Sequence, residues 1–238
     1  MKDQEKCKVS VILPSYNERE NIVEAIERLS AALGKDLHEI IIIDDNSPDG
    51  TWKIVQDLKK PHCKLIRRMD ERGLASAIAR GIDEAQGNII AWLDCDLGVP
   101  PEVLPPLVEK LYEYDVAIAS RYVDGGKDTR PRFRAFLSVL INYFANLLLG
   151  FEVRDYTSGV IAVRKDVFGK ITLSKKGFGE YFTEFVYKCV KNNYRIIEVG
   201  YIYETRKRGI SKSDGSILTL FKYGFQYGFK IIGLRLGR

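Results

Sequence analysis

Two aspartates separated by one residue follow an apolar run in the first half of the chain. Asp94 and Asp96 stand directly after Ile89–Leu93, which is typical of a buried strand. Residues i and i+2 of a strand point to the same side, so the two carboxylates are expected to converge. Mg²⁺ and Mn²⁺ bind such oxygen ligands together with substrate phosphates. The pair predicts a metal site for a nucleoside diphosphate, although an isolated Asp-x-Asp also fits a polar strand end.

A second acidic group follows an earlier apolar run. Asp44 and Asp45 come after Ile40–Ile43 and lead through Asn46 into Ser-Pro-Asp-Gly-Thr at 47–51. That segment is typical of a β-turn whose Ser or Asp side chain caps the next helix. The turn does not require two carboxylates at a strand end, so we expect a turn and a ligand-binding role together.

Few residues are available for other catalytic chemistries. With only His38 and His62, serine-hydrolase triads and histidine-rich zinc sites have little support. The four cysteines have neither the spacing of a zinc site nor the density of a disulfide scaffold, which favours a reducing compartment. They are Cys7, Cys63, Cys95 and Cys189.

The elements that position these residues alternate between strand and helix patterns. Val9–Leu13 is a β-branched run ending at Pro14, and residues from Ile22 to Leu33 are apolar at helical spacing. The alternation continues through Leu74–Ala85 (helix), Asn88–Leu93 (strand), a helix opening at Pro101, and Val116–Ser120 (strand). The sequence predicts an α/β fold with a mostly parallel sheet, whose carboxyl strand ends gather the polar segments into one site.

The second half of the chain carries two long apolar segments. The sixteen residues Phe136–Phe151 contain no charge and would span ~24 Å as a helix, less than the ~30 Å hydrocarbon core of a bilayer. Ile217–Leu236 mixes apolar residues with lysines and arginine, which is typical of an interfacial helix. Both are therefore expected to lie in a membrane interface, with two core helices as the alternative.

The bulk composition fits one large domain. The chain has 238 residues, 45% hydrophobic and 29% charged, with a net charge of +5 that suits anionic partners. The first 18 residues lack an apolar run, so we expect no secretory signal. We predict a single catalytic domain over 1–238, with a nucleotide-sugar half over about 1–125, an acceptor half over 126–238, and amphipathic helices at 134–151 and 216–236.

Six motifs in this order and spacing resemble one family. They are PSYNE at 14–18, DDNSPDGT at 44–51, DCDLGVPPE at 94–102, SRY with a following GG at 120–126, DYTSG at 155–159, and R-x-x-G-x-SK at 206–212. Together they are similar to the dolichyl-phosphate mannose synthases of the family-2 glycosyltransferases. The resemblance implies a glycosyltransferase-A fold, GDP-mannose as donor, Mg²⁺ or Mn²⁺ as cofactor, and a polyprenyl (dolichyl) phosphate acceptor at the cytoplasmic face of a membrane.

The resemblance also implies roles for individual residues. The nucleotide-sugar site would comprise Pro14, Tyr16, Glu18, Ile43, Asp45, Asp94, Cys95, Asp96, Gly98, Arg121, Arg206 and Lys212. Within it, Asp94 and Asp96 would hold the metal, and Arg121, Arg206 and Lys212 would be catalytic with them. Arg134 and Ser138 would meet the acceptor phosphate. Further membrane spans or a membrane-protein partner subunit stay open, and no nucleic-acid partner is expected.

One position departs from the family pattern. Gly98 stands where the family usually has a polar residue, often Gln or Ser, so a side-chain contact to the metal or the sugar is missing. Cys95 also replaces the usual alanine. The departure at Gly98 leaves the sugar open, with a UDP-sugar such as UDP-glucose as an alternative donor.

The implied reaction needs no strong general base. The second ionisation of an acceptor phosphate lies near pH 6, so the nucleophile is already anionic near neutral pH. A single displacement would invert the anomeric centre and give a β-linked product. Two other classes remain as alternatives: a non-catalytic basic protein that binds nucleic acid or acidic membrane, and a soluble glycosyltransferase with a hydroxyl acceptor, which would need a base.

Overall fold

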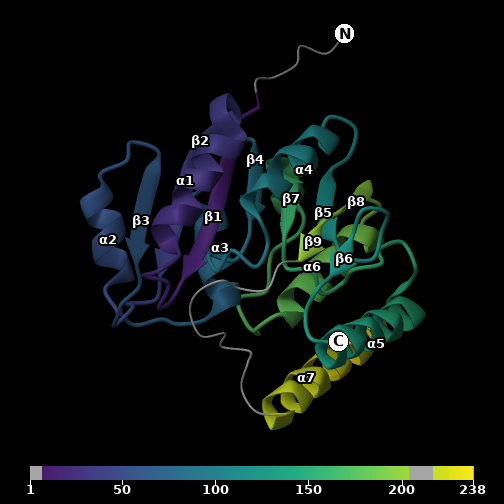
Figure 1. The fold of residues 1–238 in the computed structure, drawn as a ribbon. Coiled ribbons are helices and arrows are strands. Elements are labelled where there is room, and N and C mark those ends of the chain that lie inside the picture. Colours follow the sequence, from purple (N-terminus) through teal and green to yellow (C-terminus); the bar gives the residue numbers. More distant parts are fainter. Residues whose placement is uncertain (1–6, 204–216, 238) are drawn as a thin grey trace.

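A seven-stranded sheet forms the centre of the molecule, in the order β3-β2-β1-β4-β7-β5-β8 (Figure 1). The computed structural model describes residues 7–203 and 217–237. The strands of this sheet are β1 (Val9–Ser15), β2 (Leu37–Asp44), β3 (Cys63–Arg67), β4 (Ile89–Trp92), β5 (Val116–Ser120), β7 (Ile161–Arg164) and β8 (Ile196–Gly200). A second sheet pairs β6 (Lys127–Asp128) with β9 (Ile202–Tyr203).

The sheet is parallel except at one strand. β1 pairs in parallel with β2 and β4, β2 with β3, and β5 with β8, whereas β7 is antiparallel to both of its neighbours. In register, Ser15 lies beside Asp44, which lies beside Arg67, so the polar residues after these strands emerge at one edge. The predicted mostly parallel sheet is confirmed, and β7 is the antiparallel exception.

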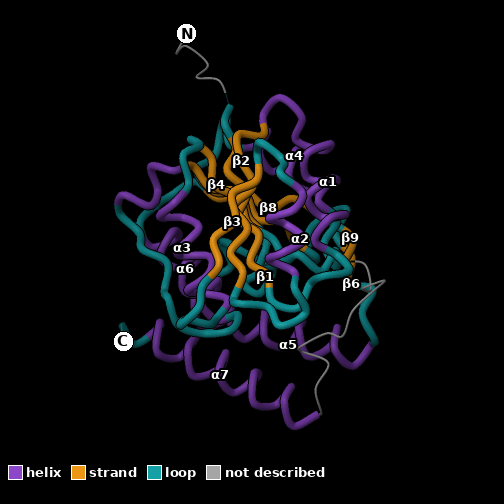
Figure 2. Tube along the Cα trace, turned by 90° about the vertical axis from the view of Figure 1, so that its left-hand side faces the viewer, coloured by secondary structure: helices purple, strands orange, loops and turns teal. Residues whose placement is uncertain are grey.

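Helices cover both faces of the sheet (Figure 2). They are α1 (Ile22–Leu33), α2 (Thr51–Leu58), α3 (Leu74–Glu84), α4 (Leu104–Lys110), α5 (Arg132–Leu149), α6 (Glu180–Lys191) and α7 (Ile217–Arg235), with 3₁₀ segments at Gly34–Asp36, Pro101–Val103 and Lys165–Gly169. One core layer packs α3 and α6 on the sheet, and the other packs α1 and α4. Because both faces are covered, the strands are nearly continuous apolar runs.

Two boundaries differ from the sequence prediction. β1 continues through Pro14 to Ser15, since its pairing with β4 ends at Ile12 and no β4 residue needs the missing N–H of Pro14. The helix expected at Pro101 begins as a 3₁₀ turn and becomes α4 only at Leu104, where the following prolines fit the first helical turn.

The apolar segments of the second half form α5 and α7, which lie side by side below the carboxyl ends of the strands in Figures 1 and 2. α5 begins at Arg132, earlier than the apolar run itself, and has 18 residues. By length and composition alone, this is the one helix among the described residues that could cross a membrane, which corrects the expectation that it is too short. Only a minor part of it is buried in the fold.

Close packing of α3 on β1 depends on Gly81. A Cβ built there would lie 2.8 Å from Cγ1 of Ile12 and closer still to Cγ2, distances that real Cβ atoms do not show. Ile12 is fully buried between sheet and helix, so it has no free space in which to move. Glycine is therefore required at this point of the helix for steric reasons.

We expect Gly81→Ala to lower the free energy of unfolding by about 1–3 kcal/mol. The strain energy of an added methyl group in the core exceeds the stabilisation that alanine gives to a helix relative to glycine. Urea unfolding followed by circular dichroism measures the change. Gly169→Ala, where a Cβ meets no neighbour, is the matched control, and an equal effect at both glycines would rule out the steric explanation.

Candidate active site

A cavity of about 1340 Å³ lies between the carboxyl ends of the strands and the helices α5 and α7. Both halves of the chain contribute to its wall. From the first half come the ends of β1, β2 and β4 and the start of α3, and from the second half come α5, α7 and the loop 157–159. The polar strand ends of the first half therefore border one continuous space.

Asp94 and Asp96 both line this cavity. The sequence argument assumed that strand alternation brings the two carboxylates together. β4 ends at Trp92, however, so they reach the cavity from a turn that follows the strand. Leu97 has a left-handed φ of 59°, and the backbone N–H of Gly98 donates to Oδ1 of Asp96 at 2.8 Å. Asp96 is thereby held in the turn, whereas Asp94 is exposed to the cavity.

The residues on this wall fit a divalent ion of the Mg²⁺ or Mn²⁺ type. Two carboxylates are enough for such an ion when phosphate oxygens and water complete the shell. Among the described residues no group of three or more His, Cys, Asp or Glu side chains gathers into a metal cluster, so a protein-only site of the zinc type has no ligand set here. Asp94 and Asp96 would hold the ion.

The two neighbouring aspartates of the second acidic group have different surroundings. Asp44 is fully buried and accepts hydrogen bonds from the backbone N–H of Ser47 at 2.8 Å and from its hydroxyl at 2.6 Å, so it builds the turn. Asp45 lines the cavity. Asp44 therefore forms the expected turn, and Asp45 lies on the cavity wall, where a ligand-binding role was expected.

Asp45 is fixed by a buried arginine that the sequence analysis did not single out. Nε of Arg68 donates to Oδ1 of Asp45 at 2.7 Å, and the backbone N–H of Gly73 donates to Oδ2 at 2.9 Å. Arg72 places its guanidinium 5.2 Å from the ring centroid of Tyr16, and both line the cavity. In the sequence, Arg68 and Arg72 belong to a charged segment after an apolar run. Such a segment is typical of a solvated turn, so neither arginine was predicted to belong to the site.

Pro14, Tyr16, Glu18 and Cys95 also line the cavity, as the resemblance implied. Two predicted residues do not. Ile43 is fully buried in the core against α3, because its position in β2 turns its side chain to that face, so its assignment to the nucleoside pocket is wrong for the side chain. Gly98 is buried beside Asp96 and is not among the residues of the cavity wall.

Arg121 lies on the cavity wall, but its charge is compensated inside the protein. Asp155 is fully buried and accepts hydrogen bonds from the Arg121 backbone N–H at 3.0 Å, from Nε at 2.9 Å and from Nη2 at 2.6 Å. Burial lowers the pKa of the guanidinium, but the charge and hydrogen bonds of Asp155 outweigh it and raise that pKa well above its ordinary value. Arg121 is therefore a permanently charged and rigidly oriented group.

Hydrogen bonds continue from Arg121 to the predicted acceptor residues. Nη2 of Arg121 donates to Oγ1 of Thr157 at 2.8 Å, and Nδ2 of Asn142 donates to the same oxygen at 2.8 Å. Four residues before Asn142 on α5, Ser138 receives a hydrogen bond from the Tyr122 hydroxyl at 2.9 Å. The position of Ser138 is thus coupled to that of Arg121.

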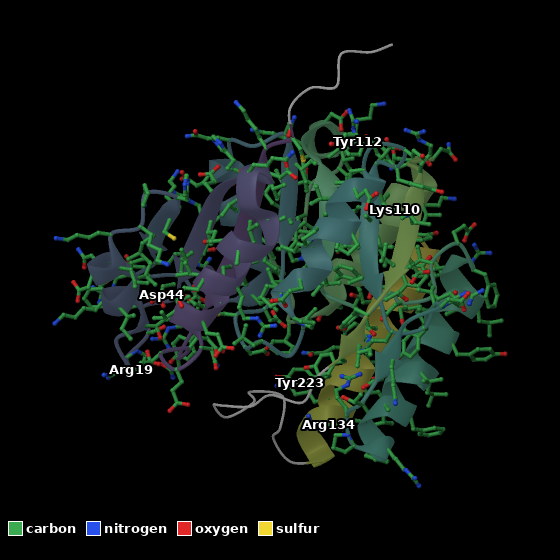
Figure 3. All side chains as sticks on the ribbon, turned by 45° about the horizontal axis from the view of Figure 1, so that its top comes forward. Arg19, Asp44, Lys110, Tyr112, Arg134 and Tyr223 are labelled. Carbon is green, nitrogen blue, oxygen red and sulfur yellow. The ribbon has the colours of Figure 1, made fainter. Side chains whose placement is uncertain are left out.

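Arg134 and Ser138 lie one turn apart on α5 and face the cavity. In Figure 3, Arg134 on α5 and Tyr223 on α7 lie at the same end of the molecule, opposite Tyr112. Beyond the arginine the wall becomes apolar, and the stacked rings of Phe178 and Tyr223, 4.8 Å apart, belong to it. Its other main members are Leu137, Ile141, Phe144, Phe225, Tyr227 and Ile231.

Two of the predicted catalytic cations, Arg206 and Lys212, lie outside the described residues. Arg130, which the sequence analysis left without a role, lines the cavity, and its guanidinium is paired with Asp128. Lys230 of α7, expected among the interfacial lysines, forms an ion pair with Glu184 of α6 and so anchors α7 to the fold.

We expect Asp155→Asn to lower the free energy of unfolding by about 3–5 kcal/mol, because it leaves the buried Arg121 charge without its main counter-ion. Urea unfolding gives the value. Asp166→Asn is the control, since Asp166 pairs with Arg164 at an exposed position and its loss should cost less than about 1 kcal/mol. Similar small losses in both variants would contradict a structural role for the buried pair.

Comparison with known proteins identifies the family of this chain. Residues 10–172 match the family described as glycosyl transferase family 2. The dolichol-phosphate mannosyltransferase of Pyrococcus furiosus is 40% identical over 223 residues, which cover 91% of this chain and 61% of that protein. This chain therefore spans less than two thirds of that relative's length. The polyprenol monophosphomannose synthase of Mycolicibacterium smegmatis is 33% identical, with 87% and 81% covered.

A solved structure resembles the whole fold at low sequence identity. It is the glucosyl-3-phosphoglycerate synthase of Mycobacterium tuberculosis in complex with Mn²⁺, UDP and glucosyl-3-phosphoglycerate, with a TM-score of 0.75 and 16% identity over 97% of this chain and 80% of that one. This likeness supports the predicted glycosyltransferase-A fold and nothing finer. The family match over more than half of the sequence, together with relatives above 30% identity, shows that this chain belongs to glycosyl transferase family 2.

Proposed function

We propose that the protein transfers mannose from GDP-mannose to a polyprenyl (dolichyl) phosphate, with inversion, at the cytoplasmic face of a membrane. The observation that carries the proposal is the composition of one cavity. Its wall combines the two carboxylates Asp94 and Asp96 with the cation and hydroxyl of Arg134 and Ser138, and continues into an apolar surface between α5 and α7. A sugar nucleotide and a lipid phosphate need these three surfaces together.

The described residues divide the reaction between them. Tyr16, Glu18 and Asp45 border the part of the cavity proposed for the nucleoside, and Asp94 and Asp96 border the part proposed for the diphosphate. A divalent ion on these aspartates would neutralise the charge that develops on the leaving nucleoside diphosphate. Arg134 and Ser138 would hold the acceptor phosphate in line with the anomeric carbon, and Arg121 would keep the loop around Thr157 in place.

Support for the lipid acceptor comes from the relatives and from the outer surface. The relatives of this chain are named for dolichol phosphate, polyprenol and undecaprenyl phosphate. The outer sides of α5 and α7 expose large apolar side chains, a composition that suits the interface of a bilayer. They include Phe133, Phe136, Val139, Tyr143, Leu147, Phe229 and Ile232.

The cytoplasmic side is proposed from the thiols. All four cysteines are free, and three of them are buried. Burial together with the charge of Asp36 raises the pKa of Cys7 to about 11, and burial raises that of Cys189 to about 12, so both remain protonated at neutral pH. Free thiols without disulfides suit a reducing compartment.

We expect Asp94→Asn and Asp96→Asn each to reduce transfer of labelled mannose from GDP-mannose to dolichyl phosphate at least about a hundredfold, because the leaving diphosphate loses its metal-binding carboxylate. Calorimetry should show a parallel loss of Mn²⁺-dependent GDP binding. Asp83→Asn, at an exposed position on α3, is the control. Unimpaired transfer in either site variant would refute the metal assignment, and label entering lipid only from UDP-sugars would refute the mannose donor.

We expect the double variant Phe136→Ser/Phe229→Ser to lower binding to phosphatidylcholine–phosphatidylglycerol vesicles at least about tenfold, since each exposed phenyl ring contributes about 1.5–3 kcal/mol when it leaves water. The two rings are 62% and 73% exposed. Vesicle co-sedimentation measures the effect. Tyr112→Ser removes a ring that is 62% exposed at the opposite end of the molecule, so it should leave vesicle binding unchanged. Equal binding by all three proteins would contradict the proposed docking face.

A further inference from the structure

The space beside Gly98 is already occupied by a tyrosine from a distant part of the chain. A Cβ built on Gly98 would lie 2.9 Å from the hydroxyl oxygen of Tyr203, 3.2 Å from its Cζ and 3.1 Å from Oδ1 of Asp96. The phenol and the carboxylate therefore leave too little room for a side chain at position 98.

Tyr203 reaches this place from the small sheet of β6 and β9. The hydroxyl of Thr129 donates to its backbone carbonyl, and the guanidinium of Arg130 lies 5.0 Å from its ring centroid. Arg130 is itself held by Asp128, at 2.9 Å from Nε to Oδ1. The ring is thus positioned by its backbone, by a fixed cation and by contact with Gly98, and it lines the cavity beside Asp96.

We propose that Tyr203 is a donor-binding residue whose hydroxyl donates a hydrogen bond to a phosphate oxygen of the nucleoside diphosphate. This inference rests on the proposed function only in placing a diphosphate at Asp94 and Asp96. A phenol hydroxyl is a ready donor to an anionic oxygen. The contact with Tyr203 also explains why position 98 holds glycine, because any larger residue would displace the phenol.

The neighbouring Tyr201 provides a matched control. Its ring centroid lies 6.5 Å from that of Tyr203, but Tyr201 is buried in the core and does not belong to the cavity wall. Its hydroxyl has no hydrogen-bond partner among the described residues, so removing it takes away no such bond. Tyr201→Phe therefore reports the effect of removing a phenol hydroxyl from the core, and Tyr203→Phe reports the effect of removing one from the cavity.

The test compares Tyr203→Phe and Tyr201→Phe in the full chain, by calorimetric binding of GDP and of UDP, each with and without Mn²⁺. We expect Tyr203→Phe to weaken binding of the nucleotide that the wild type prefers about tenfold in the presence of Mn²⁺, as loss of a hydrogen bond to a charged group predicts. Tyr201→Phe should stay within about twofold. Thermal unfolding should be unchanged in Tyr203→Phe, because its ring still fills the space beside Gly98.

A second pair of variants tests the contact between the two residues. Gly98→Ser in the wild-type background should weaken nucleotide binding, because its Cβ collides with the Tyr203 hydroxyl. In the Tyr203→Phe background that oxygen is gone, although Cζ at 3.2 Å and Oδ1 of Asp96 at 3.1 Å remain, so Gly98→Ser should cause a smaller further loss there than in the wild type. If Tyr203→Phe binds as the wild type does, or if Gly98→Ser costs the same in both backgrounds, the role of the hydroxyl is overturned while the proposed function stands. If the wild type binds neither nucleotide, both fail.

Discussion

The buried ion pair between Arg121 and Asp155 is the interaction on which the rest of the site depends. A charged guanidinium can be buried only if a counter-charge and hydrogen-bond acceptors meet it in the same place, and Asp155 accepts from two of its N–H groups and from the Arg121 backbone N–H. The pair joins the end of β5 to the segment before β7. Through Thr157 it also fixes Asn142 of α5. Three segments distant in the sequence are thereby locked at one point beside the cavity.

The donor side is organised by the same kind of constraint. Arg68 and Asp45 form a second buried ion pair, and the arginine also bonds to the Ser76 hydroxyl and the Gly73 carbonyl at the start of α3. Asp94 and Asp96 therefore lie between two regions that are rigid before any substrate binds. Preorganised charges of this kind do not have to reorient during a reaction, which is how electrostatic stabilisation becomes effective.

Local patterns predicted well those parts of the fold that are themselves local. The apolar spacing of α1 matches its buried residues, and the runs before Asp44 and Asp94 are strands as expected. β7 and its antiparallel pairing left no such signal, since its four residues look like any short apolar run and their direction is decided by distant partners. Arg68 and Tyr203 escaped notice for the same reason. Their importance arises from what they meet in space, at Asp45 and at Gly98.

The inward side of α5 carries two buried asparagines spaced by one helical turn. Nδ2 of Asn142 donates to Thr157, and Nδ2 of Asn146 donates to the backbone carbonyl of Arg154 at 3.3 Å. If the helix rolled about its own axis, each amide would lose its bond to the segment after α5 and keep only its bond to a carbonyl of α5, that of Ser138 or of Asn142, at a cost of about 0.5–1.5 kcal/mol each. The two bonds therefore oppose an exchange of its outer and inner sides. A push on the outer aromatic residues would reach Arg134 and Ser138 as a rigid shift of the whole helix, without any twist that could separate them from each other.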